Sequence, residues 1–296
     1  MLALHRRRPQ IHPMSEPATF AWLKSRALIL IGGSDWRSFL QGLITQDVDT
    51  LRPGEARFGA LLTPQGRLLY DLFVIGREGG CWLDVLAEHR AAIVQRLTMY
   101  RLRARVEIVA DETPVAVYYG KDVFGRAAPP EGQAWSPDPR LAALGWRGYG
   151  VGPPAGAIVV DEAARDAAKL VVGVPAPADW GSDKTYPIEA NFDLLNGIDF
   201  KKGCFVGQET TSRMKRRGQI KSRMLPIAFE GPAPAVGAEV LAAELRAGEV
   251  TSVGQGRAMA LVRLDRAQGG GLTVEGRPVR LERPVWFVAA LGETSA

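Results

Sequence analysis

The chain contains little cysteine and little histidine, which limits the disulfide and metal chemistry open to it. Its two cysteines, Cys81 and Cys204, are too few for a disulfide framework in 296 residues and indicate a reducing compartment. His89 is the one histidine outside the first 13 residues, and no histidine–cysteine pair has the spacing of metal ligands. We therefore expect no complete metal site within one chain. A cluster shared with a second chain through Cys204 is left open.

Long apolar runs are also absent. No segment approaches the roughly 18–20 apolar residues that a membrane helix needs, and the N-terminus lacks the apolar core of a secretion signal. These absences predict a cytoplasmic protein with no membrane partner. Residues 1–16 read as a basic, disordered tail, with a short transit-like segment and a misassigned start codon as the alternatives.

Positive charge is concentrated in one place. Residues 201–221 hold seven basic residues and one acid, a net charge of +6, whereas the whole chain carries +5. A cluster of this kind favours an anionic partner such as a polycarboxylate, a phosphate or nucleic acid. A solvated surface loop is the usual explanation for a charge run, but the residues beside this one favour a functional role.

Those residues form the most informative stretch of the chain, Lys202-Gly203-Cys204-Phe205-Val206-Gly207-Gln208-Glu209, which is followed by Arg213. The stretch combines a thiol, an amide, a carboxylate and a guanidinium, and glycines lie on both sides of the thiol. Such a mixture is typical of a loop shaped around chemistry or a ligand. Nearby lysines would favour the thiolate of Cys204, although no base for nucleophilic catalysis is evident. A partly buried structural thiol is the alternative.

Two acids elsewhere are candidates for a ligand site. Asp71 interrupts a strand-like run that is otherwise apolar, so we expect it either to be paired with a backbone or arginine partner or to line a pocket. Glu189 lies between apolar neighbours, where a carboxylate is able to accept two hydrogen bonds from the flat edge of a pterin. An acid in the first turn of a helix is the alternative for Glu189, and the local pattern does not separate the two.

Apolar periodicity predicts two α+β regions and a β-rich unit. The first region, residues 17–111, has the order of a ferredoxin-like unit, with strands at 26–31, 56–62, 66–75, 81–85 and 105–109 and helices at 36–44 and 88–100. The second, residues 112–222, has a strand at 114–119, a Pro/Gly-rich surface connection at 127–155, a weak strand at 158–160 and a helix near 161–171. Residues 223–296 consist of short runs separated by Gly and Pro, which is typical of a small β-barrel or sandwich.

The run from Pro187 to Arg213, with its Lys-Gly-Cys-Phe-Val-Gly-Gln-Glu motif, closely resembles the YgfZ-type folate-binding family. The likeness extends to the segments 39–48, 64–67 and 100–103 and covers the chain from about residue 20 onward. The family is related to the aminomethyltransferase (T-protein) of glycine cleavage. The resemblance implies an aminomethyltransferase-like α+β fold, with two α+β regions and a C-terminal β-barrel around a central folate channel.

The resemblance also implies a function. Family members act in the assembly or repair of iron–sulfur proteins, with tetrahydrofolate as the ligand and iron–sulfur client or assembly proteins as partners. Cys204 matches the family's cysteine and is expected to make a redox contact or a transient contact with sulfur or a cluster. Asp71 resembles an aspartate near the folate N5, and Glu189 a pterin-recognising glutamate. We also expect folate contacts from Lys202, Gly203, Gln208, Glu209 and Arg213.

Two other functions compete with this one. A folate-dependent aminomethyl or one-carbon transferase would use Asp71 in chemistry at N5, but ordinary T-proteins lack the cysteine motif, so an accessory factor is favoured over an enzyme. A nucleic-acid-binding module would use the basic cluster. Aromatic residues are not interleaved with the basic residues of 215–221, which counts against nucleic acid as a partner.

Overall fold

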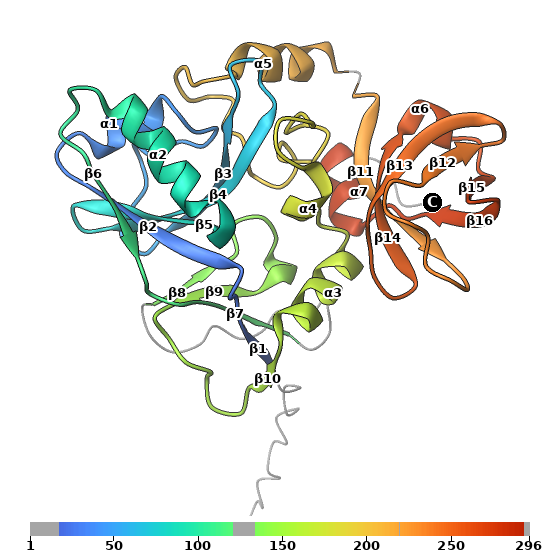
Figure 1. Cartoon of the computed structure of the whole chain (residues 1–296), viewed down its shortest axis with the longest axis horizontal. Helices are drawn as coiled ribbons and strands as arrows, with labels where there is room; N and C mark the ends of the chain where they lie inside the picture. The colour runs from blue at the N-terminus through green and yellow to red at the C-terminus, as the bar shows by residue number, and fades with distance from the viewer. Residues whose placement is uncertain (1–17, 121–133, 219, 293–296) are drawn as a thin grey trace, which may run out of the picture.

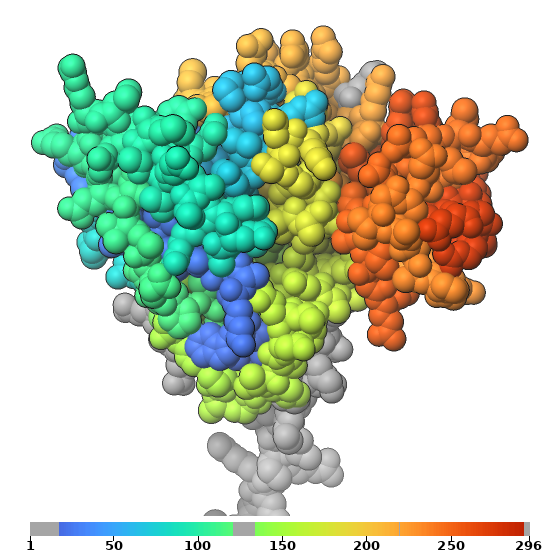
Figure 2. Space-filling view, viewed as in Figure 1, coloured from blue at the N-terminus to red at the C-terminus, as the bar shows by residue number. Residues whose placement is uncertain are grey.

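The computed structural model describes residues 18–120, 134–218 and 220–292, which form two five-stranded sheets and a closed barrel (Figure 1). The predicted tail 1–16 lies outside the described residues. The barrel, drawn in orange and red, lies to one side of the two sheets (Figures 1 and 2). This α+β architecture with a C-terminal barrel is the predicted fold class. The predicted domain boundaries stay a prediction.

The first sheet is antiparallel, with the strand order β3-β4-β5-β2-β6. Its strands are β2 (Arg26–Gly32), β3 (Ala56–Leu62), β4 (Leu68–Arg77), β5 (Gly80–Leu86) and β6 (Glu107–Asp111). Its helical segments are α1 (Trp36–Gln41), η1 (Ala87–His89) and α2 (Arg90–Arg101). Apolar residues of both α-helices pack with one face of the sheet in a single core. The predicted order of strands and helices in this region is therefore confirmed.

One helix in this region is shorter than predicted. The periodicity of 36–44 predicts a helix through Ile44, but α1 ends at Gln41. Leu43 and Ile44 remain buried because the turn after α1 carries them against β3, where Ile44 forms an isolated bridge with Leu61. A tight turn thus preserves the buried face that the helical spacing suggested.

The second sheet has the order β10-β1-β7-β9-β8. Its strands are β1 (Thr19–Trp22), β7 (Val115–Tyr119), β8 (Trp135–Pro137), β9 (Trp146–Tyr149) and β10 (Ile158–Val160). Around it and after it come η2 (Ala142–Leu144), α3 (Glu162–Val172), α4 (Pro177–Trp180) and α5 (Gln208–Arg217). The prediction of a surface connection at 127–155 is wrong for its described part, because β8 and β9 pair there and bury Trp135 and Arg147. Residues 127–133 lie outside the described residues.

The C-terminal unit is a closed barrel with the order β11-β14-β13-β12-β15-β16, and β11 pairs with both β14 and β16 to close it. Its elements are β11 (Ser222–Phe229), β12 (Glu239–Ala242), β13 (Leu245–Val253), β14 (Arg257–Arg263), α6 (Leu264–Ala267), β15 (Leu272–Val274), β16 (Arg277–Leu281) and α7 (Val285–Leu291). Helix α7 returns to the second region, where the indole of Trp286 donates a 2.9 Å hydrogen bond to the carbonyl of Val172. One apolar core joins all three units and includes Phe73, Val117 and Met259.

Candidate functional site

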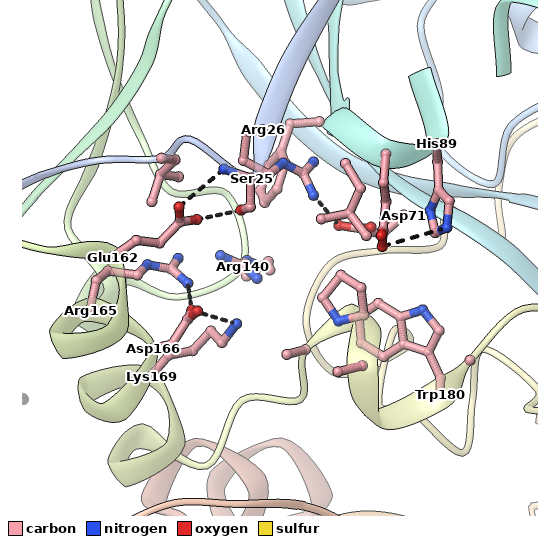
Figure 3. A pocket seen from close by; sticks show the side chains of 18 of the residues that line it. Ser25, Arg26, Asp71, His89, Arg140, Glu162, Arg165, Asp166, Lys169 and Trp180 are labelled. Atoms are coloured by element: carbon pink, nitrogen blue, oxygen red, sulfur yellow. Dashed lines mark hydrogen bonds and ion pairs between the residues drawn. The ribbon is translucent and has the colours of Figure 1, made fainter. Parts of the chain in front are cut away.

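A cavity of about 430 Å³ lies between β2 and β4 of the first sheet and the helices α3 and α4 (Figure 3). This volume is within the range of small-molecule sites. Much of its wall is charged, which is unusual for so buried a position. The charged residues that matter most here are Arg26, Asp71, Arg140, Arg165 and Lys169, and the indole of Trp180 supplies an aromatic surface.

A buried ion-pair network forms the wall at the first sheet. Arg26 bridges two aspartates, with its Nη1 3.0 Å from Asp71 Oδ2 and its Nε 2.6 Å from Asp84 Oδ1. Asp84 also accepts hydrogen bonds from the Arg147 guanidinium and, at 3.2 Å, from the Tyr149 hydroxyl. Burial on its own raises the pKa of Asp84, but the charges of Arg147 and Arg26 outweigh burial and hold that pKa below its ordinary value. The two arginines therefore hold the buried carboxyl of Asp84 in its ionised form.

Asp71 satisfies both of the alternatives that the sequence left open. It lines the cavity, and it is paired with Arg26. The aromatic ring of Phe73 packs against this network, with the Arg147 guanidinium 3.8 Å and the Arg140 guanidinium 4.8 Å from its centroid. The cavity wall is thus set by arginines that the sequence alone did not single out.

Helix α3 supplies the opposite wall and was missed as a site element. Its sequence places Glu162, Arg165, Asp166 and Lys169 at the spacing of one helical face, and all four line the cavity. Asp161 caps the helix by accepting a 2.8 Å hydrogen bond from the amide of Ala164. Charges at this spacing usually mark a solvated face, so the one signal available in the sequence pointed the wrong way.

Cys204 lies in an exposed loop that a half-buried lysine, Lys202, holds in place. The ammonium of Lys202 donates hydrogen bonds of 2.7, 2.7 and 2.9 Å to the carbonyl oxygens of Gln41, Ile44 and Gln46. Gln41 is the last residue of α1, and the other two lie in the turn that follows it. Burial lowers the pKa of Lys202 to about 8, and nearby aspartates, Asp47 first, oppose that shift. Cys204 itself is exposed, whereas Cys81 is buried and burial raises the pKa of its thiol. Cys81 thus packs as a small buried hydrophobe in β5.

A second contact fixes the other end of this loop. Gly207, with φ +82°, precedes α5, and a Cβ there would lie 2.6 Å from the carbonyl oxygen of Thr63 and 2.9 Å from the Cα of Gly66. Glycine is required at both positions because the two backbones approach this closely. Three of the segments that carry the family resemblance, 39–48, 64–67 and 202–213, therefore meet in one place.

Substitution of Lys202 with methionine is expected to release the loop. The change removes three charge-assisted hydrogen bonds and should lower the free energy of unfolding by about 2 kcal/mol, and it should raise amide hydrogen exchange in residues 203–207. Lys201→Met is the matched control because Lys201 is exposed and adjacent. Equal exchange in the two variants would show that the three hydrogen bonds do not hold the loop.

The predicted site residues fall into two places. Asp71 lines the cavity, but the other predicted residues that the structure describes are absent from its lining. Cys204 and Gly203 are exposed in the loop, and Glu209 and Arg213 are exposed in α5, which lies along the upper edge of the molecule (Figure 1). The predicted folate contacts of Lys202, Gly203, Gln208, Glu209 and Arg213 stay predictions, and the Lys202 ammonium is already occupied.

Glu189 lies in a turn and not in the cavity lining. Its carboxylate accepts a 3.0 Å hydrogen bond from the amide of Tyr186, three residues earlier. Burial raises the pKa of Glu189, and the Tyr186 hydrogen bond and the charges of Arg67 and Arg223 oppose that shift. Glu189 is therefore engaged in a turn and not in the first turn of a helix, which was its alternative, and pterin recognition by Glu189 stays a prediction.

Comparison with known proteins identifies relatives of about three quarters of the chain and, separately, a family that matches its barrel. Residues 221–289 match the family described as the C-terminal beta-barrel domain of CAF17. Iron-sulfur cluster assembly factor IBA57, mitochondrial, of Mus musculus is 32% identical over 255 residues, 75% of this chain and 71% of that protein. The Homo sapiens protein of that name is 29% identical over 256 residues, 76% of this chain and 72% of that protein.

The fungal relatives are longer than this chain. The Neurospora crassa IBA57 homolog is 31% identical over 243 residues, which are 73% of this chain but 55% of that protein. The chain thus spans about half the length of the fungal relatives that it matches. In three dimensions it is similar to the glycine cleavage system aminomethyltransferase T of Bartonella henselae, with a TM-score of 0.71 and 19% identity over 90% of this chain and 84% of that one. This likeness shows an aminomethyltransferase-like fold.

The prediction of a cytoplasmic location is wrong. The relatives from Neurospora crassa, Mycosarcoma maydis, Mus musculus and Homo sapiens are mitochondrial proteins. The prediction failed because the lack of a long apolar run and of a secretion signal, like a low cysteine count, does not separate the cytoplasm from other reducing compartments. Within the described ranges, no helix has the length and apolarity to cross a membrane.

Proposed function

Because the chain belongs to the IBA57 family of iron–sulfur cluster assembly factors, we propose that it takes part in the assembly or repair of iron–sulfur proteins. In this proposal Cys204 makes a transient contact with sulfur or a cluster, and the cavity binds a reduced folate. Its partners are iron–sulfur client or assembly proteins. The finer assignment, to the YgfZ-type branch, rests on the Lys-Gly-Cys-Phe-Val-Gly-Gln-Glu motif.

The observation that carries the proposal is the exposed thiol of Cys204, which lies on a loop that the hydrogen bonds of Lys202 hold in place. A structural thiol is normally buried, as Cys81 is, whereas Cys204 is open to a partner while Lys202 holds its backbone in place. One thiol supplies one of the four ligands that an iron–sulfur cluster usually takes. The remaining ligands would come from the partner. The basic residues of α5 next to the loop favour a partner with an acidic surface.

A reduced folate fits the cavity in size and chemistry. The volume of about 430 Å³ suits a ligand of that class, and the Trp180 indole offers a flat surface for a pterin or a benzoyl ring. The transferase alternative receives no such support, because Arg26 engages the carboxylate that would steer chemistry at N5. We therefore propose folate as a ligand and not as a group donor.

Anaerobic titration with tetrahydrofolate is expected to quench tryptophan fluorescence with saturation, because Trp180 lines the cavity. Ala178→Trp should abolish saturation by filling the cavity mouth, since Ala178 is exposed and lines the cavity. Leu245→Trp is the matched control, because it adds a tryptophan at an exposed position of the barrel, away from the cavity lining. Glu189→Ala then tests pterin recognition. No binding at millimolar tetrahydrofolate would remove folate from the proposal.

A further inference from the structure

One end of the cavity holds buried cations with few partners. Arg165 Nη1 lies 3.2 Å from Asp166 Oδ1, and Lys169 Nζ lies 3.3 Å from the same oxygen. The side chains of Arg165 and Lys169 are 10% and 9% exposed, whereas that of Asp166 is 54% exposed. Within the described residues, a guanidinium with five N–H groups and an ammonium with three thus share one half-exposed carboxylate.

Other carboxylates near this end are already engaged. Asp138 accepts two hydrogen bonds from Arg140, of 2.9 and 2.7 Å. Glu162, one turn before Arg165 on α3, accepts hydrogen bonds from the amide and hydroxyl of Ser25. Among the described residues, Asp166 is therefore the one carboxylate that forms an ion pair with Arg165 or Lys169 in this corner of the cavity (Figure 3).

The burial of two cations beside one shared carboxylate is reflected in the pKa of both groups. Burial, and then the charge of Arg140, lower the pKa of Arg165. Burial, and then the charge of Arg165, lower the pKa of Lys169 to about 8. Each cation is therefore less stable here than in water, and a bound anion would relieve both.

We propose that Arg165 and Lys169, with Arg140 beside them, form an oxyanion subsite that binds a carboxylate or phosphate group of the cavity's ligand. The inference rests on the proposed function only for the identity of that ligand. If the ligand is a reduced folate, the group is a carboxylate of its glutamyl tail. If it is another small molecule, a phosphate group is the alternative source of the same chemistry. Arg140 is fixed by Asp138 and by its position over the rings of Phe58 and Phe73.

The subsite is tested with three probes: tetrahydrofolate, a tetrahydropterin without the aminobenzoyl-glutamate, and inorganic phosphate. We expect Arg165→Gln and Lys169→Met to weaken tetrahydrofolate binding about tenfold or more, as for loss of a charge-assisted contact, and to leave tetrahydropterin binding unchanged. Arg246→Gln is the matched control because it removes one positive charge from an exposed barrel position. Arg165→Lys should restore part of the affinity.

The same probes separate this inference from the folate proposal. If tetrahydrofolate does not bind but phosphate slows acylation of Lys169 by an amine reagent, the folate proposal fails and the oxyanion subsite stands. If Arg165→Gln and Lys169→Met bind tetrahydrofolate and phosphate as the native chain does, or if neither probe binds the native chain, the subsite is overturned. Without ligand, Arg165→Gln should melt no lower than the native chain, since it removes a buried charge with little compensation.

The subsite also predicts a dependence on pH. Lys169 faces Arg165 and Asp166 on its own helix, Arg140 from the second region and Asp179 from α4. Its ammonium is charged below about pH 8 and neutral above it, so anion affinity should fall as pH rises through and beyond that value. In Lys169→Met this decline should be absent. A decline of equal size in both proteins would assign it to another group.

Discussion

Replacing Asp84 with asparagine is expected to lower the free energy of unfolding by about 3–5 kcal/mol, the cost of breaking a buried ion pair from one side. The side chain of Asp84 is fully buried and forms ion pairs with two arginines. Its Oδ1 lies 2.6 Å from Nε of Arg26, and its Oδ2 pairs with the guanidinium of Arg147. Asparagine keeps the shape of aspartate but not its charge. Both guanidinium groups would then be buried with too little negative charge. Denaturation by urea, followed by circular dichroism, measures the change.

Glu249→Gln is the control for this substitution. Glu249 pairs with Arg246 at 2.6 Å, but both side chains are about half exposed, so the pair contributes little. The pH dependence supplies a second test. Because its folded-state pKa is depressed, Asp84 contributes stability in full above the ordinary aspartate value, and that stability is lost as pH falls below it. Asp84→Asn should therefore lose less stability than the native chain on acidification. Similar acid sensitivity in both would assign it to other carboxylates.

Replacing Cys204 with serine is expected to reduce the activation of an iron–sulfur client by at least about tenfold, in line with loss of a cluster ligand, while leaving stability unchanged. The thiol is exposed, so its loss removes little packing. The loop should keep its conformation because Lys202, and not Cys204, anchors it to α1. Anaerobic reconstitution of an aconitase-type apoprotein, with and without this chain, measures activity through the client's turnover and cluster absorbance.

Cys81→Ala provides the matched control because it removes the other thiol of the chain. Cys81 is buried in β5, so this change should cost some stability and leave client activation intact. If Cys204→Ser supports activation as well as the native chain does, the thiol is not the contact for sulfur or a cluster. The loop and the basic face of α5 would then be interpreted as a protein-docking surface alone.

Many elements of the fold could be predicted because their signals are local. The apolar run of β3 and the helical spacing of α2 depend on neighbouring residues, and both elements appear in the structure at the expected places. Strands β8 and β9 could not be predicted, because the sequence around them is rich in Pro and Gly. Arg147 also interrupts β9 with a buried charge whose partner, Asp84, lies 63 residues away.

The sequence by itself determined the fold class, the kinship with iron–sulfur cluster assembly factors and the position of the Cys204 loop, because each is encoded in a contiguous pattern or motif. Only the tertiary structure decided how the charged groups are paired and which of them share a site. Arg26 meets Asp71 across 45 residues, and Lys202 meets Gln41 across 161 residues. Such contacts depend on how strands and helices pack, and a charge's environment, more than its place in the sequence, sets its chemistry. For that reason the α3 corner of the cavity and its separation from Cys204 became apparent only in three dimensions.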